Sequence, residues 1–236
     1  MINYIFHTSD IHISDDRIDN LENSFNILIK DILEKGALES ILVIVGDIFE
    51  NKTHVTTNEL CIFQWMIHNL NKNKIQTIII PGNHDFNINN MSKTETDIFK
   101  HTSIEILIDQ YPAIKCLTYS QIYRVPDSNI DFHVLSIIDN KVPMFRENPH
   151  RISIGLYHGA VNGAVYDNDT VIDGEKFSIA DFSKYDYTML GDIHKPQFLE
   201  PNIAYCGSFV QKNKGEGLDH GYILWDLVKK CGMHKF

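Results

Sequence analysis

The sequence predicts an α/β protein with a single domain over residues 1–236, built as a layered α/β/β/α sandwich. In the first third of the chain, continuous apolar runs alternate with amphipathic segments, which is typical of parallel strands joined by helices. Further apolar runs of strand length follow in the second half. No internal repeat, low-complexity segment or linker divides the chain, so we expect one domain.

The first strand and helix are predicted from apolar periodicity. Residues 2–9 are expected to form a strand, and the segment after it has helical spacing with one apolar face. Asp19 or Asn20 can cap this helix, and Gly36 is expected to stop it. Residues 41–45 form a continuous apolar run, as expected for a central strand buried on both faces.

A second helix and a third strand complete the opening third. Thr56 and Glu59 form a plausible capping box at the start of the helix. Residues 75–80 are predicted to form the strand, which Pro81 and Gly82 end. This β-α-β-α-β order predicts a parallel sheet with right-handed crossovers.

The remainder of the chain is less regular at first. The middle, about residues 91–130, is expected to hold a helix and a variable loop. Ser178 and Asp181 indicate the start of a short helix later on. Four apolar runs predict the other strands: residues 132–138, 152–157, 186–190 and 221–226.

The composition is that of a globular protein without a membrane segment. The 236 residues are 43% hydrophobic, and no apolar run reaches the roughly 18 residues of a membrane-spanning helix. The N-terminus lacks the basic region of a secretory signal, so we expect an intracellular location, cytoplasmic or nuclear. The cysteines lack C-x-x-C spacing, which excludes a zinc ribbon. We expect buried free thiols at all four: Cys61, Cys116, Cys206 and Cys231.

Polar side chains follow five of the apolar runs. The fragments are Asp10-Ile11-His12, Gly46-Asp47, Gly82-Asn83-His84-Asp85, His158-Gly159 and Gly191-Asp192-Ile193-His194. Each fragment alone is weak, because glycine, aspartate and asparagine are common in turns. Together they supply Asp, His and Asn side chains at the ends of several strands, which is what a two-metal phosphoesterase needs.

The spacing of these residues suits metal coordination. Asp10 and His12 lie two apart, so in an extended chain both would point to one side and could bind one ion. Asp47 follows the neighbouring strand and could bridge two ions, and Asn83 offers a neutral oxygen. Three later side chains could close the cluster: His158, Asp192 and His194. This mixed nitrogen and oxygen set suits Mn, Fe or Zn better than Ca.

On these fragments the chain resembles the calcineurin-like metallophosphoesterase superfamily over nearly its whole length. Within it, the chain is most similar to the DNA-repair nucleases of the SbcD/Mre-eleven type. The segments that carry the resemblance are His7–His12, Gly46–Phe49, Pro81–Asp85, Leu190–Gln197, Tyr205–Ser208 and Gly215–Tyr222.

The resemblance implies a role for each residue. It implies a first ion held by Asp10, His12 and His194 and a second held by Asn83, His158 and Asp192, with Asp47 bridging them. His84 would not bind metal but would face the scissile phosphate, where it stabilises the transition state or protonates the leaving oxygen. Asp85 would fix the local turn.

Two positions depart from the family pattern. The family has Gly-His-x-His near the end, whereas position 192 here is Asp. A carboxylate at Asp192 could still bind the ion and would favour Mn; alternatively Asp192 does not reach, and the second site is weak. Many such nucleases have a histidine where this chain has Glu50, which cannot donate to a phosphate. His54 could substitute for it.

These considerations favour a Mn-dependent hydrolase with two divalent ions. The leading hypothesis is a phosphodiesterase acting on DNA, an exonuclease or endonuclease in DNA repair or recombination, with His84 as the catalytic residue. One alternative is a phosphatase or phosphodiesterase for small molecules or phosphoproteins, because the same centre serves both. Another is a non-catalytic module with a decayed second metal site.

The charge and the chain end bear on the expected partners. The formal net charge of −10 argues against a broad basic surface for gripping DNA, although two bound cations would add four positive charges where a phosphate lies. The family's DNA-capping domain and ATPase-binding segment are expected to be absent. The partners implied by the resemblance are a DNA substrate, an SMC-like ATPase subunit and a second copy of the chain; no membrane partner is expected.

Overall fold

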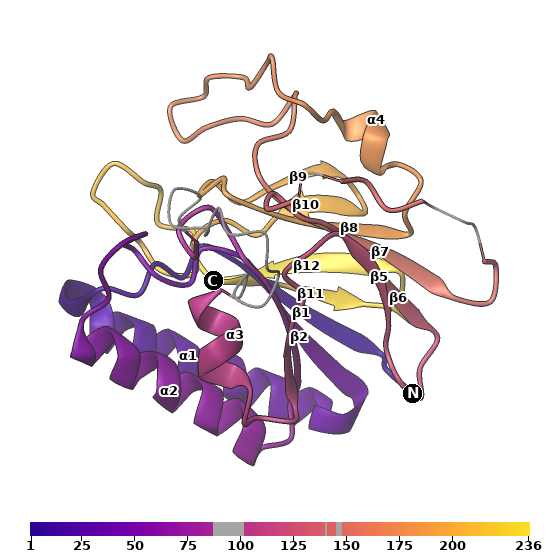
Figure 1. Ribbon diagram of the computed structural model, residues 1–236. Helices are drawn as coiled ribbons and strands as arrows, with labels where there is room; N and C mark the ends of the chain where they lie inside the picture. Colours follow the sequence, from indigo (N-terminus) through magenta and orange to yellow (C-terminus); the bar gives the residue numbers. More distant parts are fainter. Residues whose placement is uncertain (87–101, 140, 145–147) are drawn as a thin grey trace, which may run out of the picture.

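The computed structural model describes residues 1–86, 102–139, 141–144 and 148–236. Two six-stranded sheets pack face to face (Figure 1). The first sheet, with strand order β12-β11-β1-β2-β3-β4, contains β1 (Tyr4–Thr8), β2 (Ser40–Val45), β3 (Gln76–Ile80), β4 (Ile114–Cys116), β11 (Tyr222–Asp226) and β12 (Cys231–Lys235). The second, with order β5-β6-β7-β8-β10-β9, contains β5 (Gln121–Arg124), β6 (Ile130–Leu135), β7 (Ile152–His158), β8 (Tyr187–Gly191), β9 (Gln197–Glu200) and β10 (Ile203–Tyr205).

Helices flank this pair of sheets. Three helices lie along the outer face of the first sheet: α1 (Ile18–Lys35), α2 (Thr57–Lys72) and α3 (Ser103–Ile108) (Figure 1). Outside the second sheet lies α4 (Ile179–Phe182), a single turn within a long loop. Separate apolar clusters fill the three spaces between these layers. The predicted α/β/β/α sandwich is therefore confirmed, with an outer fourth layer made mostly of loop.

The parallel opening of the chain is also confirmed. Strand β2 pairs in parallel with β1 on one side and with β3 on the other. In the second sheet, β7 pairs in parallel with both β6 and β8. The segments that follow β1, β2, β3, β7 and β8 meet at one end of the sandwich. Backbone hydrogen bonds join the segments after β1 and β2 and those after β7 and β8, and the amide of His84, after β3, donates to the side chain of Asp47, after β2. This end carries the predicted site.

The helix starts were predicted correctly in two of three cases. The capping boxes of Thr56 with Glu59 and of Ser178 with Asp181 are both present. For α1 the prediction was wrong, because a 3-10 turn over Asp15–Arg17 precedes the helix and places Asp19 inside it. The glycine stop was correct: Gly36 ends α1 with a φ of 96° that a side chain would disfavour.

The strands that the sequence did not predict are short or lie away from the centres of the two sheets. Strands β4, β5, β9, β10 and β12 have three to five residues, and β5, β9 and β12 have few buried side chains. The expected strand at residues 132–138 runs instead over Ile130–Leu135. The helix expected in the middle is α3, and residues 91–101 of that region lie outside the described residues.

The prediction of four buried thiols was wrong for three of them. Cys206 is buried, Cys61 is exposed, and Cys116 and Cys231 are intermediate. Cys61 lies on the outward side of α2, and the other two are on strands at the edges of the first sheet. In the described residues, no helix combines the length and the apolar character needed to cross a bilayer.

Candidate metal centre

Unusual backbone conformations position the ligand side chains. Asp10, His12, Asp47 and Asp192 have positive φ angles of 50°, 47°, 54° and 92°. The expectation that Asp10 and His12 lie in extended chain was therefore wrong, although both do point into one cluster. Left-handed backbone is uncommon for residues with a Cβ, and its recurrence at this end of the sandwich is typical of a functional site.

Backbone hydrogen bonds tie the loops together. The amide of Asp10 donates to the carbonyl of Gly46 at 3.0 Å, and the amide of His12 donates to that of Asp47 at 3.0 Å. Gly82 allows a close approach, because a Cβ there would lie 2.2 Å from Oδ1 of Asp47. The loops after β1, β2 and β3 thus pack against one another at the base of the site.

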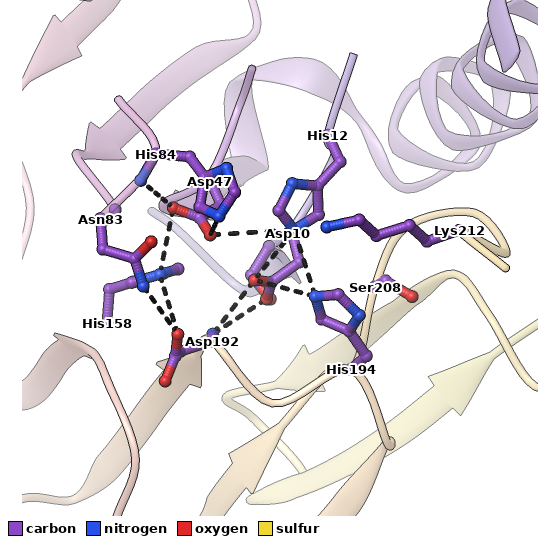
Figure 2. Close-up of polar contacts among 12 residues, drawn as sticks. Asp10, His12, Asp47, Asn83, His84, His158, Asp192, His194, Ser208 and Lys212 are labelled. Atoms are coloured by element: carbon purple, nitrogen blue, oxygen red, sulfur yellow. Dashed lines mark hydrogen bonds and ion pairs between the residues drawn. The ribbon is translucent and has the colours of Figure 1, made fainter. Parts of the chain in front are cut away.

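Asp10, His12 and His194 form the first half of the cluster (Figure 2). Nε2 of His12 lies 3.1 Å from Nε2 of His194, and these two atoms lie 3.8 and 3.9 Å from Oδ1 of Asp10. Two imidazole nitrogens and a carboxylate oxygen therefore converge on one point. Such convergence is favourable when a cation lies among the three atoms.

Asp47 lies between the two halves. Its Oδ2 is 3.7 Å from Nε2 of His12, whereas its Oδ1 is 3.3 Å from Nε2 of His158. One carboxylate therefore offers a separate oxygen to each half, which is the arrangement of a bridging ligand.

Asn83, His158 and Asp192 form the second half (Figure 2). Oδ1 of Asp192 is 3.0 Å from Nδ2 of Asn83 and 3.7 Å from Nε2 of His158. The aspartate that stands in place of a histidine thus reaches this half. The backbone amide of Asp192 also donates to Asp10 at 3.0 Å, which connects the two halves.

The burial of the charged groups shifts their titration. Asp10 is 1% exposed, and burial raises its pKa to about 6. Burial lowers the pKa of His12 to about 2. Burial alone would raise the pKa of Asp47, but the neighbouring His158 outweighs this and holds it well below its usual range. The pKa of His158, which burial would lower, is raised because Asp47 lies beside it.

The residues present fit two divalent cations. Among the described residues, the ion-pair partners of the buried carboxylates of Asp10 and Asp47 are all imidazoles. Asp10 also accepts hydrogen bonds from Ser9 and the amide of Asp192, and Asp47 accepts one from the amide of His84, but none of these donors carries a full positive charge. Nε2 of His158 and Oδ1 of Asn83 are buried and have no hydrogen-bond partner among the residues that the structure describes. Buried carboxylates and unpartnered polar atoms are costly unless something compensates them. A binuclear metal site accounts for both observations.

Other contacts fix the orientation of the histidines. Nδ1 of His194 lies 2.8 Å from Oε1 of Glu216, and Nδ1 of His158 lies 2.7 Å from the carbonyl oxygen of Val45. Each contact places a proton on Nδ1, so that Nε2, which points toward the cluster, is the nitrogen that would bind a metal ion. Both imidazoles are thus oriented to bind metal through Nε2.

Asp85 joins the loops after β2 and β3. Its Oδ1 accepts from the amide of Ile48 at 2.9 Å, and its Oδ2 accepts from the amide of Gly82 at 2.8 Å. Burial raises the pKa of Asp85 to about 7. This contact set matches the expectation that Asp85 fixes the turn.

His84 lies at the rim of the cluster, and its side chain is 25% exposed. Its Nδ1 contacts the carbonyl oxygen of Glu50 and therefore donates a proton there. Its Nε2 points toward Asp47, with Oδ2 at 4.0 Å. Because His12, Asp47 and His84 also lie close enough to hold an ion, spacing alone does not separate the catalytic role of His84 from a ligand role.

All the predicted site residues come together, and sequence reasoning missed some of their neighbours. Glu216, which supports His194, and Arg17 were not assigned roles. Glu50 was considered only as a departure from the family pattern and Lys212 as a solvated lysine that could touch a phosphate backbone, and their contact with each other was not foreseen. In the sequence, Glu216 is distinguished only as an acidic residue between two glycines. His54, considered as a substitute phosphate donor, is exposed.

Comparisons with known proteins agree with this geometry. A family model described as calcineurin-like phosphoesterase matches residues 4–196. The uncharacterized protein R555 of Acanthamoeba polyphaga mimivirus is 33% identical in an alignment 249 positions long, which covers 97% of this chain. The alignment covers 18% of that protein, so the chain spans less than a fifth of the relative's length.

Two solved structures are also similar. TT1561 of Thermus thermophilus aligns over 99% of this chain and 98% of its own, with a TM-score of 0.51 and 10% identity, which shows a shared fold alone. YfcE, a phosphoesterase from E. coli, aligns over 94% and 88% with 12% identity, and its TM-score of 0.38 is too low to support an argument. Because the family model matches most of the chain, the protein belongs to the calcineurin-like phosphoesterase family.

Proposed function

We propose that this protein hydrolyses phosphate esters with two divalent ions, which we assign as Mn, and with His84 as the catalytic residue. The observation that carries the proposal is the position of Asp47, whose two oxygens face the histidines of different halves. Asp10, His12 and His194 would hold one ion, and Asn83, His158 and Asp192 the other. Such ions bind the phosphate oxygens, lower the pKa of a water and stabilise the charge of the transition state.

The chain's own catalytic contribution is assigned to His84. Because Nδ1 is committed to the carbonyl of Glu50, only Nε2 is available to a substrate. A protonated imidazole donates its Nε2 proton to the leaving oxygen, and a fixed ring orientation favours that transfer. The partial exposure of His84 agrees with a position between the metal cluster and solvent.

The charges around the site favour a compact substrate, such as the phosphate ester of a small molecule or phosphoprotein. The cations at the rim are paired in the described residues: Arg17 and Lys212 with Glu50, and Lys195 with Asp169. With a net charge of −10, this chain offers little sequence-independent attraction for a long polyanion. A compact ester needs contacts only at its own phosphate.

Cleavage of DNA is the second candidate. It is favoured by the resemblance of Leu190–Gln197 and Tyr205–Ser208 to the SbcD/Mre-eleven type of nuclease. In this candidate, an SMC-like ATPase subunit or a second copy of the chain would supply a basic surface, which the net charge of −10 does not favour on this chain. The reaction at the phosphorus would use the same residues.

A substrate panel in Mn separates these candidates. It comprises p-nitrophenyl phosphate, bis-p-nitrophenyl phosphate, a cyclic nucleotide, a phosphopeptide, and linear and circular DNA. Preferred turnover of the small esters or the phosphopeptide supports the leading proposal, whereas preferred loss of DNA supports the nuclease. Hydrolysis of none of them, with one ion or none bound per chain, would contradict both and indicate a non-catalytic module.

A further inference from the structure

Glu50 connects the first half of the site to two cationic side chains. It lies in the segment after β2, and its Oε2 is 3.4 Å from Nδ1 of His12. The same carboxylate is 2.9 Å from Nη2 of Arg17 and 3.1 Å from Nζ of Lys212. Its backbone carbonyl contacts Nδ1 of His84. Glu50 therefore contacts both a metal-site histidine and the catalytic histidine.

Lys212 is not a solvated surface lysine. Its side chain is 22% exposed, and Figure 2 shows its amino group directed at the site beside His12 and Asp10. The backbone on both sides of it is fixed: its amide donates to Oε2 of Glu216 at 2.7 Å, and its carbonyl accepts from Arg17 at 3.2 Å. The flexible side chain of Lys212 thus extends from a backbone that hydrogen bonds hold in place.

Two cationic side chains share the carboxylate of Glu50. Arg17 lies 2.9 Å and Lys212 lies 3.1 Å from it, and Arg17 also lies 3.7 Å from the exposed carboxylate of Asp16. If Lys212 turns away from Glu50, Arg17 still neutralises that carboxylate. The ammonium can therefore move to an incoming anion without leaving the Glu50 carboxylate unpaired.

We propose that Lys212 binds the phosphate group of the substrate beside the first half of the metal site, and that Glu50 holds its amino group ready there. The inference rests on the proposed function and adds a recognition residue to it. Lysine is suited to this task, because its ammonium is a mobile point charge with three donors. A phosphomonoester dianion or a phosphodiester would each supply the acceptor oxygens.

The test compares variants by their affinity for inorganic phosphate, measured by titration calorimetry on the Mn-loaded full chain. Lys212→Met should weaken phosphate binding by about tenfold or more, the range for hydrogen bonds to charged groups. The same variant should raise KM by a similar factor with kcat little changed, as for uniform binding. Lys212→Arg keeps the charge and should recover most of the affinity.

Two controls separate phosphate binding from a structural role. Lys30→Met removes the same charge from an exposed position on α1 and should leave phosphate affinity unchanged. The double variant Glu50→Gln with Lys212→Met removes the negative charge of Glu50 together with its lysine partner. If it binds phosphate as tightly as the wild type, Lys212 acts only by neutralising Glu50, and the inference is overturned.

The outcome also distinguishes this inference from the proposed function. A wild-type chain that hydrolyses no ester contradicts the proposed function, while a phosphate affinity that depends on Lys212 would still support the binding role. Unchanged phosphate affinity in Lys212→Met, with ester hydrolysis intact, overturns the inference alone.

Discussion

The two halves of the metal cluster are supported differently. In the first half, the imidazoles of His12 and His194 each face a carboxylate from outside the cluster, Glu50 at 3.4 Å and Glu216 at 2.8 Å. In the second half, His158 is held by a neutral backbone carbonyl. Asn83 and Asp192 contact each other there, and the side chain of Asp192 is 26% exposed.

This difference indicates which half binds its ion more firmly. Glu216 lies within hydrogen-bond distance behind His194, so it fixes that ring and raises its basicity. Glu50 adds a negative charge near His12 without a hydrogen bond to its Nδ1. The first half is therefore prepared for a cation mainly through His194. The second half depends more on the negative charge of Asp192, which lies partly in solvent. We therefore expect the two ions to bind with unequal affinity, the first more tightly.

The largest expected effect is that of removing the group shared by both halves. Asp47→Ala should lose both ions and lower the hydrolysis rate by about a thousandfold or more, because each half loses the Asp47 oxygen that faces it. Metal content after gel filtration, with the initial rate on the best ester of the panel, measures this. Asp19→Ala, an exposed change in the first turn of α1, is the control. A variant that retains two ions would show that Asp47 bridges nothing.

The next largest effect is expected at His84, which lies at the rim of the cluster rather than in either half. His84→Ala should lower kcat by roughly 10²- to 10⁴-fold, the range for general acid–base groups, while both ions stay bound. His54→Ala, a change at an exposed histidine in the segment before α2, should leave kcat unchanged. Loss of an ion from the His84 variant would assign His84 to the ligands, as its distance from His12 and Asp47 permits.

A smaller effect tests the support of the first half directly. Glu216→Gln keeps the shape but removes the charge behind His194, and it should weaken Mn binding in the first half by about tenfold, the low end for such partners. Calorimetric titration with Mn should show the change in the tighter of two binding steps.

Asp192→Asn is the matched comparison for the second half, because it is also a carboxylate-to-amide change. It should weaken only the looser step and leave the tighter step in place. If both variants alter the same step, the two halves are not independently supported, and the contrast between them fails.

The parts of this structure set by local pattern were predictable from the sequence. Continuous apolar runs mark the central strands β1, β2 and β3, and a capping box marks the start of α2. The gathering of the candidate site residues was also predictable, because Asp, His and Asn side chains follow several buried strands, although each fragment alone is common in turns. Strand adjacency then brought Asp10 and Asp47 together.

The parts set by long-range contacts were not predictable. Glu216 supports His194 across 22 residues, and Lys212 reaches Glu50 across a larger separation that no spacing rule links. The left-handed backbone at Asp10 and His12 depends on hydrogen bonds to the loop after β2, so an extended chain was the natural but wrong expectation.

The last prediction concerns stability rather than activity and involves His7 of β1, which lies beneath both halves. His7 is fully buried, and its Nε2 donates to the carbonyl of Leu190 at the end of β8, so it connects the strand before Asp10 to the strand before Asp192. Burial lowers the pKa of His7 from 6.5 to about 3, with the nearby His234 lowering it further and the Leu190 contact opposing. The folded chain thus keeps this imidazole neutral.

The sign of the resulting pH dependence follows from linkage. Below its ordinary pKa the unfolded chain binds a proton at His7 that the folded chain does not, so the free energy of unfolding falls as pH falls from about 6.5 toward 3. Between pH 7 and pH 5 the metal-free wild type should lose about 2 kcal/mol more than His7→Gln in urea unfolding. His68→Gln, exposed on α2, should keep the wild-type dependence. An equal loss in the wild type and His7→Gln would mean that His7 takes up its proton in the folded chain. The contact between β1 and β8 at His7 and Leu190 would then not require a neutral imidazole.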